Sequence, residues 1–270
     1  MRRALVLVLA LALAFAHAIG CYDWTLPPLG VAEAGSGADA GDAASSCTSD
    51  AGPSMVAFAG PRGAVLCIDA TEVTQAQYGV FLAARGGDVA GQVDTCTSNV
   101  TFAPGCPGFD PAVHPALPVA CVDWCDAYAF CRWANKRLCG DIDGGASTAS
   151  ADVRQCARTD QWVRACSHND DGLHAYPYGN TFEASRCNEE ADATAPVASK
   201  AGCVGGFPGL FDMRGNVAEW VDSCKPGYCA IHGGFAEQGI SNLDCCGAQA
   251  FPPREDFHKD LGFRCCRIEP

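Results

Sequence analysis

The sequence is short of positive charge. Of its 270 residues, 18 are Lys or Arg and 31 are Asp or Glu, so the formal net charge is −13. Proteins that hold DNA or RNA use clustered basic side chains to contact phosphates, and a chain this acidic does not suit that purpose. We therefore exclude nucleic acid as a partner.

The sequence also lacks a long apolar run and the usual spacings of a zinc site. Its longest apolar run extends from Ala4 to Ala16, whereas a membrane-spanning helix needs about 20 residues. The histidines show neither HxxxH nor HExxH spacing, and Cys121 and Cys125 have no second pair of ligands beside them. We therefore expect neither a membrane-spanning helix nor a zinc site.

Cysteine is abundant instead, with 19 in the chain, an odd number. The N-terminus has two arginines, then the apolar run, then Ala18-Ile19-Gly20-Cys21, which resembles a bacterial lipobox, where the cysteine receives diacylglycerol. This predicts a lipoprotein-type signal peptide over residues 1–20 and lipidation of Cys21. Eighteen cysteines then remain for disulfides in an oxidising compartment. The alternative is an ordinary signal peptide, which leaves Cys21 free to pair.

Composition divides the rest of the chain into a linker and one domain. Residues 30–46 are almost wholly Gly, Ala, Ser and acidic residues, with no aromatic side chain. Such a stretch buries too little apolar surface to fold, so we expect residues 21–54 to form a flexible acidic linker. Dense patterning then continues over residues 55–270 without a comparable gap or an internal repeat, which indicates a single domain.

Three helix starts are visible in this domain. Thr74 begins a capping box that ends at Gln77, and Asp123 is placed to cap a helix that stops near Asn135. Thr159 is placed to cap a third helix that carries Trp162 inward. Elsewhere Gly, Pro and Cys dominate, with only short apolar runs. The pattern predicts an α+β domain that is rich in disulfides and poor in regular secondary structure.

Six segments resemble, in order, blocks of one known family. They are IDATEVTQAQYGVFL (68–82), PVACVDWCDAYAFCRWANKRL (118–138), YPYGN (176–180), GLFDMRGNVAEW (209–220), HGGF (232–235) and LGFRC (261–265). Together they resemble the formylglycine-generating enzymes, whose domains are also called sulfatase-modifying-factor domains. The resemblance implies the formylglycine-generating-enzyme fold, which is an α+β variant of the C-type-lectin architecture.

The family's enzymes oxidise a cysteine in a sulfatase CxPxR segment to formylglycine with O₂ and a copper(I) ion held by two cysteines. Counted from Gly234 of the GG motif, those two positions fall on Gln238 and Leu243. Thiolates select copper(I), and neither amide nor alkyl groups replace them. A shifted loop offers Cys245 and Cys246 as an alternative. We expect no copper site and assign no catalytic residue.

The resemblance also implies disulfide pairs. The two family bridges map to Cys131–Cys265 and to Cys166 with Cys245 or Cys246. Proximity in the sequence suggests further pairs, and Cys139 and Cys156 bracket an insertion that the family pattern lacks. The further expected pairs are Cys139–Cys156, Cys96–Cys106, Cys224–Cys229 and Cys187–Cys203.

In the family, the loop within GLFDMRGNVAEW binds calcium. The ligands map to the side chains of Asp212 and Glu219 and to the carbonyl groups of Gly215 and Val217. Oxygen ligands of these kinds are the ones that calcium prefers, so the resemblance implies one structural calcium ion. The alternative is a tight turn in which the two carboxylates cap backbone amides.

These features predict a lipoprotein of the bacterial cell envelope, held by its lipid on the periplasmic or outer face of a membrane. Its domain is expected to be non-catalytic, serving in binding or in envelope structure. Two alternatives stay open, which are a formylglycine-generating oxidase and a lectin-like carbohydrate-binding module. The membrane is the expected partner, and the sequence identifies no protein or glycan ligand.

Overall fold

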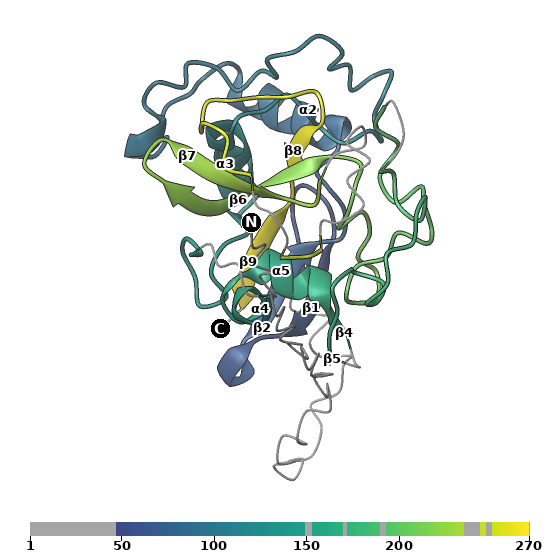
Figure 1. The fold of residues 1–270 in the computed structure, drawn as a ribbon. Coiled ribbons are helices and arrows are strands. Elements are labelled where there is room, and N and C mark those ends of the chain that lie inside the picture. Colours follow the sequence, from purple (N-terminus) through teal and green to yellow (C-terminus); the bar gives the residue numbers. More distant parts are fainter. Residues whose placement is uncertain are drawn as a thin grey trace, which may run out of the picture. The chain divides into compact units, whose positions relative to one another are not determined.

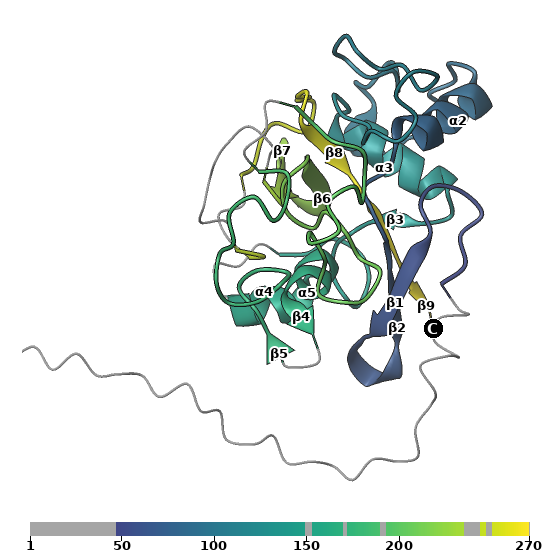
Figure 2. The same ribbon diagram turned by 90° about the vertical axis from the view of Figure 1, so that its right-hand side faces the viewer.

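Figures 1 and 2 show the fold of the chain as a computed structural model. The structure describes residues 47–148, 153–169, 172–189, 193–234, 244–246 and 250–269, all within one compact unit, Ala38–Pro270. Cys21, Gln238 and Leu243 lie outside the described residues, as do the expected signal peptide and most of the expected linker. Among the described residues, no helix is both long and apolar enough to cross a membrane.

Helix α2 (Gln75–Arg85) begins at the capping box that the sequence predicts. The Thr74 side chain accepts a hydrogen bond from the Gln77 amide (3.3 Å), and the Gln77 side chain accepts one from the Thr74 amide (2.9 Å). The helix ends at Gly86, whose φ of 57° is left-handed. Its buried face carries Tyr78 and Phe81.

Helix α3 (Trp124–Trp133) begins at a second capping box. The Asp123 side chain accepts from the Asp126 amide (2.8 Å), and the Asp126 side chain accepts in return from the Asp123 amide (3.2 Å). Asn135, two residues beyond the helix, has a φ of 56°, as expected for a residue that tolerates the left-handed conformation. Both predicted ends of this helix are confirmed.

The predicted cap of the third helix is wrong by one residue. Thr159 is the last residue of α4 (Val153–Thr159), and a separate helix, α5 (Gln161–Ser167), follows it. The Asp160 side chain caps α5 by accepting from the Val163 amide (3.0 Å). A carboxylate three residues before a free amide is a strong cap, and Thr159 is already committed to the preceding helix.

A four-stranded antiparallel sheet joins the start of the described chain to its end. Its order is β1 (Met55–Ala59), β2 (Val65–Asp69), β9 (Cys265–Glu269) and β3 (Arg137–Leu138). In the central pair, Leu66 lies opposite Ile268. Figure 2 shows β1, β2 and β9 side by side. The first and last parts of the domain are therefore adjacent in space.

A second sheet has β6 (Ala218–Lys225) between antiparallel β7 (Tyr228–His232) and parallel β8 (Leu261–Phe263). A single residue, Arg264, separates β8 from β9, so it connects the two sheets. The remaining elements are a short hairpin and two 3₁₀ helices, namely β4 (His168–Asn169), β5 (Gly172–Leu173), Pro61–Gly63 and Asp94–Cys96.

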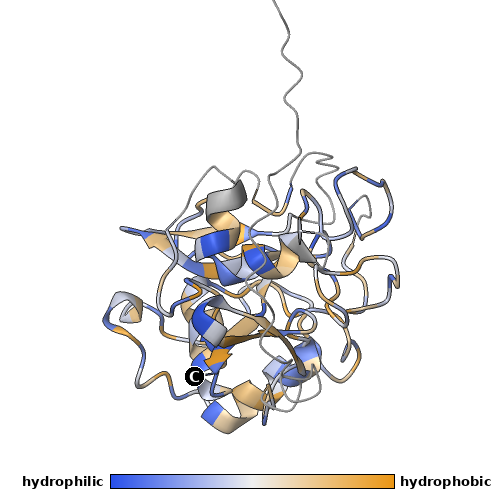
Figure 3. Cartoon of the chain, turned by 90° about the horizontal axis from the view of Figure 1, so that it is seen from below, coloured by the Kyte–Doolittle hydropathy of each residue, from blue (hydrophilic) through white to orange (hydrophobic). Residues whose placement is uncertain are grey.

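The core consists of two clusters of buried hydrophobic residues. One contains aromatic side chains of α2, α3 and the second sheet, with Phe130 and Phe263 at 5.3 Å between ring centroids. The other contains Trp162 of α5, Leu66 of β2 and Met213 of a loop. Figure 3 shows hydrophobic and hydrophilic stretches on the same helices, as expected for elements that bury one face.

Disulfide bonds connect these elements. Within the described residues, all eighteen cysteines from Cys47 onward form nine bridges. The bridges are Cys47–Cys67, Cys96–Cys125, Cys106–Cys121, Cys131–Cys265, Cys139–Cys266, Cys156–Cys246, Cys166–Cys245, Cys187–Cys203 and Cys224–Cys229. Both pairs that the family resemblance implies are among them, and so are two of the four that proximity suggested.

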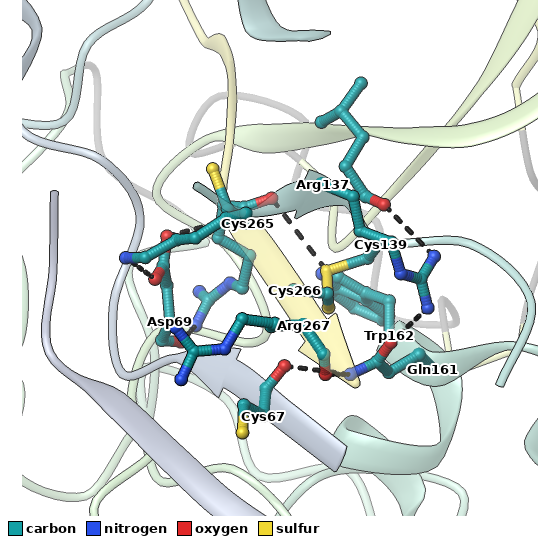
Figure 4. The surroundings of a disulfide bond; sticks show 12 residues. Cys67, Asp69, Arg137, Cys139, Gln161, Trp162, Cys265, Cys266 and Arg267 are labelled. Atoms are coloured by element: carbon teal, nitrogen blue, oxygen red, sulfur yellow. Dashed lines mark hydrogen bonds and ion pairs between the residues drawn. A yellow bond between two sulfur atoms is a disulfide. The ribbon is translucent and has the colours of Figure 1, made fainter. Parts of the chain in front are cut away.

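The other two proximity pairs are wrong. Cys139 follows β3, which pairs with β9, so its partner is Cys266 rather than Cys156 (Figure 4). Cys156, in α4, is bonded to Cys246. Cys96 is likewise bonded to Cys125 on α3, and not to Cys106. Strand pairing and helix packing, rather than distance along the chain, decide which sulfurs meet.

The packed part of the chain begins before the expected domain start at Met55. Cys47 falls in the expected linker, yet it is bonded to Cys67 of β2 and is only 6% exposed. Pro53 also belongs to the packed structure, because its carbonyl accepts a hydrogen bond from buried Lys136 (2.8 Å). The expected linker therefore ends in a segment that is attached to the sheet.

Candidate functional site

The loop before β6 has a conformation that requires glycine at one position. Asp212, Gly215 and Asn216 have positive φ angles of 53°, 72° and 63°. A Cβ atom at Gly215 would lie 2.7 Å from the carbonyl oxygen of Asn188, so a larger residue does not fit. The Gly215 amide donates to the Gly233 carbonyl (2.9 Å), and the Asn216 amide donates to the Asn188 carbonyl (2.8 Å). Two neighbouring segments thus fix the loop.

Both oxygens of the Glu219 carboxylate accept hydrogen bonds from buried donors. Arg264 Nη2 donates to Oε1 (2.7 Å), and Arg264 Nε lies 3.0 Å from Oε1 and 2.8 Å from Oε2. Trp162 Nε1 donates to Oε2 (2.7 Å). All three side chains are buried. Three N–H groups thus donate to a carboxylate that offers about four acceptor sites, and both of its oxygens are engaged.

Arg264 is the centre of this cluster. Its Nη1 donates to the Asp69 carbonyl, and its Nη2 donates to the carbonyls of Phe211 and Asp212, each at 3.1 Å. Burial lowers the pKa of its guanidinium, but nearby carboxylates, Glu219 first, more than offset this and raise the pKa above its ordinary value. Arg264 therefore stays charged, and it connects both sheets to the loop.

Glu72 and Asp212 form a second part of the cluster, in which two carboxyl groups interact. Glu72 is fully buried, and burial together with the charge of Asp212 raises its pKa well above the ordinary value. Glu72 Oε1 accepts from Asn216 Nδ2 (3.1 Å), and a side-chain hydrogen bond with Glu72 acts to lower the pKa of Asp212. Asp212 also accepts from the Ala198 amide (2.5 Å). Burial raises the pKa of Asp212 as well.

A separate buried ion pair lies beside this cluster. Lys136 Nζ donates to the Asp69 carboxylate, and both side chains are fully buried. The second oxygen of Asp69 accepts from the Cys265 amide (2.8 Å), and Figure 4 shows these two residues together. Burial raises the pKa of Asp69 to about 6, against the opposing effect of Lys136. Asp69 thus connects buried Lys136 to the backbone of Cys265, next to Arg264.

The four expected calcium ligands do not form an open cation site in this arrangement. Arg264 and Trp162 donate to both oxygens of Glu219, and Asp212 faces an amide and Glu72. No group of three or more His, Cys, Asp or Glu side chains in the described part of the chain could hold a metal ion. Gly215 and Val217 would have to supply ligands beside a carboxylate that is already bound. Calcium binding at these residues therefore stays a prediction of the family resemblance.

The GG motif follows β7 and lies against α5. Gly233 and Gly234 have φ angles of 90° and 74°. Before them, the His232 ring stacks on Trp162, with centroids 4.8 Å apart, and His232 Nε2 lies 3.8 Å from Asp160 Oδ2. Trp162 therefore contacts both the start of the GG segment and Glu219. The segment and the Arg264 cluster are parts of one buried assembly.

The cysteines near the copper-ligand positions are not free. Gln238 and Leu243 themselves lie outside the described residues. Cys245 and Cys246, which a shifted loop would offer as a pair, are bonded to Cys166 of α5 and to Cys156 of α4. A sulfur in a disulfide is not a thiolate and does not bind copper(I).

Glu72 and Arg264 are site residues that the sequence motifs did not predict. Both lie within the family segments, in IDATEV and LGFRC, and each is a charged residue in an otherwise largely apolar stretch. A charged side chain in a buried stretch needs a partner of opposite charge or a change in its protonation. The sequence therefore indicated that both residues have buried polar partners. What the sequence did not reveal was which residues, 45 or more positions away, would meet them.

We expect Glu72→Gln to become more stable relative to the native chain as the pH rises. The folded pKa of Glu72 is raised, so its stabilising effect is complete below the unfolded pKa of about 4.5 and decreases as the pH rises toward the folded value. The difference in free energy of unfolding should grow by about 1.4 kcal/mol per pH unit in this range. Urea unfolding at pH 5, 6, 7 and 8 measures it.

Glu183→Gln, at an exposed ion pair with Arg186, is the matched control for this experiment. Its difference from the native chain should stay within about 0.5 kcal/mol at every pH. A difference for Glu72→Gln that does not change with pH would show that Glu72 is ionised in the folded protein.

Comparison with known proteins identifies the family. The model of the sulfatase-modifying factor enzyme 1-like domain matches residues 55–268. The inactive C-alpha-formylglycine-generating enzyme 2 of Mus musculus is 30% identical to this chain over 118 residues, which are 40% of this chain and 32% of the mouse protein. The match thus spans about a third of the length of that relative.

Solved structures show the same fold. PvdO from Pseudomonas aeruginosa has a TM-score of 0.53 at 19% identity, over 82% of this chain and 98% of PvdO. CarF has a TM-score of 0.50 at 22% identity, over 76% of this chain and 87% of CarF. The expected fold class, with mixed helix and sheet, little regular structure and many disulfides, is confirmed. The chain belongs to the family of sulfatase-modifying-factor domains, to which the formylglycine-generating enzymes also belong.

Proposed function

We propose that the chain is a lipid-anchored member of this family that works in the cell envelope and does not catalyse formylglycine formation. The observation that carries the proposal is the pairing of all eighteen cysteines from Cys47 onward. Bridges persist in oxidising compartments, so their number supports a location outside the cytoplasm. Cys21 is then the cysteine left over, and it directly follows the lipobox-like residues.

The absence of catalysis is supported by the chemistry of copper(I) binding. Neither Gln238 nor Leu243 offers a thiolate, and Cys245 and Cys246 are held in separate bridges. The mouse relative is itself described as inactive. In this proposal the domain has kept the family fold and has lost the pair of sulfurs on which the oxidation depends.

The lectin-like alternative has little support from the tryptophans. Trp124, Trp162 and Trp220 are at most 4% exposed, so they are not available to stack on a sugar ring. Two of them donate their indole N–H to buried carbonyls, Trp124 to Val221 and Trp220 to Val122. These rings serve the core, and we do not propose a carbohydrate site.

We expect the native chain to bind no copper(I) and to convert no peptide. In competition with a copper(I) chelator the native chain should retain no metal, and with a CxPxR peptide and O₂ it should yield no formylglycine by mass spectrometry. The double variant Gln238→Cys, Leu243→Cys restores the family pair and should retain about one copper(I) per chain. One equivalent bound by the native chain, or turnover of the peptide, would refute the non-catalytic proposal.

For calcium, we propose that the loop binds no ion, because both oxygens of Glu219 accept hydrogen bonds from Arg264 and Trp162 and the side chain of Asp212 faces Glu72. Addition of CaCl₂ to chelator-treated protein should then change the melting temperature by less than about 1 °C, because a ligand that binds the folded state weakly stabilises it little. Calorimetry should show no heat of binding. A large shift, with a change in the fluorescence of Trp162, would mean that calcium displaces Arg264 from Glu219 and that the family site is retained.

A further inference from the structure

A cavity of about 240 Å³ lies between α2 and α3, two helices that Figure 2 shows next to each other. It belongs to neither the Arg264 cluster nor the GG segment. The lining residues come from one face of each helix and from the connection after α2. They include Phe81, Arg85, Gln92, Tyr128, Arg132 and Trp133.

Aromatic rings form the floor and one wall of the cavity. Phe81 is fully buried and contacts Trp133, with centroids 5.5 Å apart, and Phe102, at 5.2 Å. Tyr128 is half-buried and stacks on Trp124 at 4.8 Å. The Cys96–Cys125 bridge ties the connection to α3 at the same place. The cavity is therefore held in shape by the core and by a crosslink, and ordering it on binding costs little.

The charged side chains that line the cavity are arginines, one of which, Arg85, forms an ion pair with Asp88 outside the lining (4.0 Å). The lining contains two arginines and, among the described residues, no Asp or Glu, in a chain with a net charge of −13. Arg85 is fixed, because its side chain donates to the carbonyls of Asp88 (2.9 Å) and Ala90 (2.6 Å). Arg132, in the last turn of α3, is exposed and forms no ion pair with a described residue. Arg132 is thus available to an anion.

A buried acceptor completes the lining. The Gln92 side chain is oriented by the bond from its Nε2 to the Asn99 carbonyl (2.8 Å). Its Oε1 is buried and has no hydrogen-bond partner in the described part of the chain. An acceptor in this state favours a ligand that brings an N–H or O–H group, because an unmade hydrogen bond in a buried place is costly.

We propose that this cavity binds the C-terminal residue of a peptide chain, where that residue is aromatic or large and apolar. The side chain lies against Trp133 and Tyr128, the carboxylate pairs with Arg132, and the residue's amide N–H donates to Gln92 Oε1. A chain end offers these three groups around one carbon atom. The cavity is smaller than a typical drug site, so it suits one residue rather than a longer segment. The proposal does not depend on whether the domain is catalytic.

The test uses the full chain with its bridges intact and a matched set of small probes. N-acetyl-L-phenylalanine carries all three groups, its C-terminal amide lacks the carboxylate, and 3-phenylpropanoate lacks the amide N–H. By ligand-detected NMR titration, we expect the first to bind with a Kd of about 1 mM or tighter. The C-terminal amide should bind at least about tenfold more weakly, and 3-phenylpropanoate about fivefold more weakly.

The variant Arg132→Gln removes the charge at an exposed position. It should weaken the binding of N-acetyl-L-phenylalanine about tenfold and leave the affinity for its C-terminal amide unchanged. Arg62→Gln, at another exposed arginine outside the cavity, is the control and should bind as the native chain does. Three results would each overturn the proposal. They are equal affinities for N-acetyl-L-phenylalanine and its C-terminal amide, an unchanged affinity in Arg132→Gln, and no binding of any probe at about 5–10 mM.

A further arm distinguishes a chain end from a free small acid. The tripeptide Ala-Ala-Phe should bind at least as tightly as N-acetyl-L-phenylalanine, because the cavity opens to solvent beside the exposed residues Ala90 and Gly91. A tripeptide that fails to bind, while the small acid binds, would overturn the assignment to a chain end.

Discussion

Three consecutive residues, Arg264, Cys265 and Cys266, hold this domain together. The buried guanidinium pairs with Glu219 at the start of β6 and donates to carbonyls of β2 and of the loop before β6. The two sulfurs next to it are bonded to Cys131 of α3 and to Cys139 beyond β3. These bridges close loops of 134 and 127 residues, each worth roughly 4–5 kcal/mol in the chain-entropy model. Loss of either partner would leave an unpaired buried charge, which is strongly destabilising. The ion pair and the two crosslinks therefore stabilise the same short segment.

The functional proposal follows from the same use of cysteine. A domain of this size does not need nine bridges in order to form a core, and the family's chemistry needs only two thiolates in one loop. Here Cys245 and Cys246, the sulfurs nearest to that loop, connect it to α5 and α4. In the buried cluster, the Arg264 guanidinium likewise pairs with Glu219, and burial raises the pKa of Glu72. The disulfides and the buried cluster both make the domain rigid. The candidate binding cavity between α2 and α3 lies apart from that cluster.

The sequence predicted the local and family-level features well, and the reasons are physical. Capping boxes act over three residues, so the starts of α2 and α3 were visible. Disulfides that the family resemblance implied, such as Cys131–Cys265, were also found. Pairs inferred from proximity failed where strand pairing decided the partner, as for Cys139. The Glu72 and Arg264 contacts span 144 and 45 residues, and no local pattern specifies such distant partners. The residues expected to bind calcium lie in the loop before β6 and at the start of that strand, and their carboxylates face Arg264 and Glu72.

Assignment of every sulfur tests the account most directly. Peptide mapping of the native chain without reduction, by mass spectrometry, should give nine bridges, including Cys139–Cys266, Cys156–Cys246 and Cys166–Cys245, with no free thiol among them. The N-terminal peptide should begin at Cys21 and carry acyl chains. Two free thiols at Cys245 and Cys246, or a Cys21 that is bonded to another cysteine, would contradict the view that the eighteen later cysteines are crosslinks and that the remaining one is an anchor.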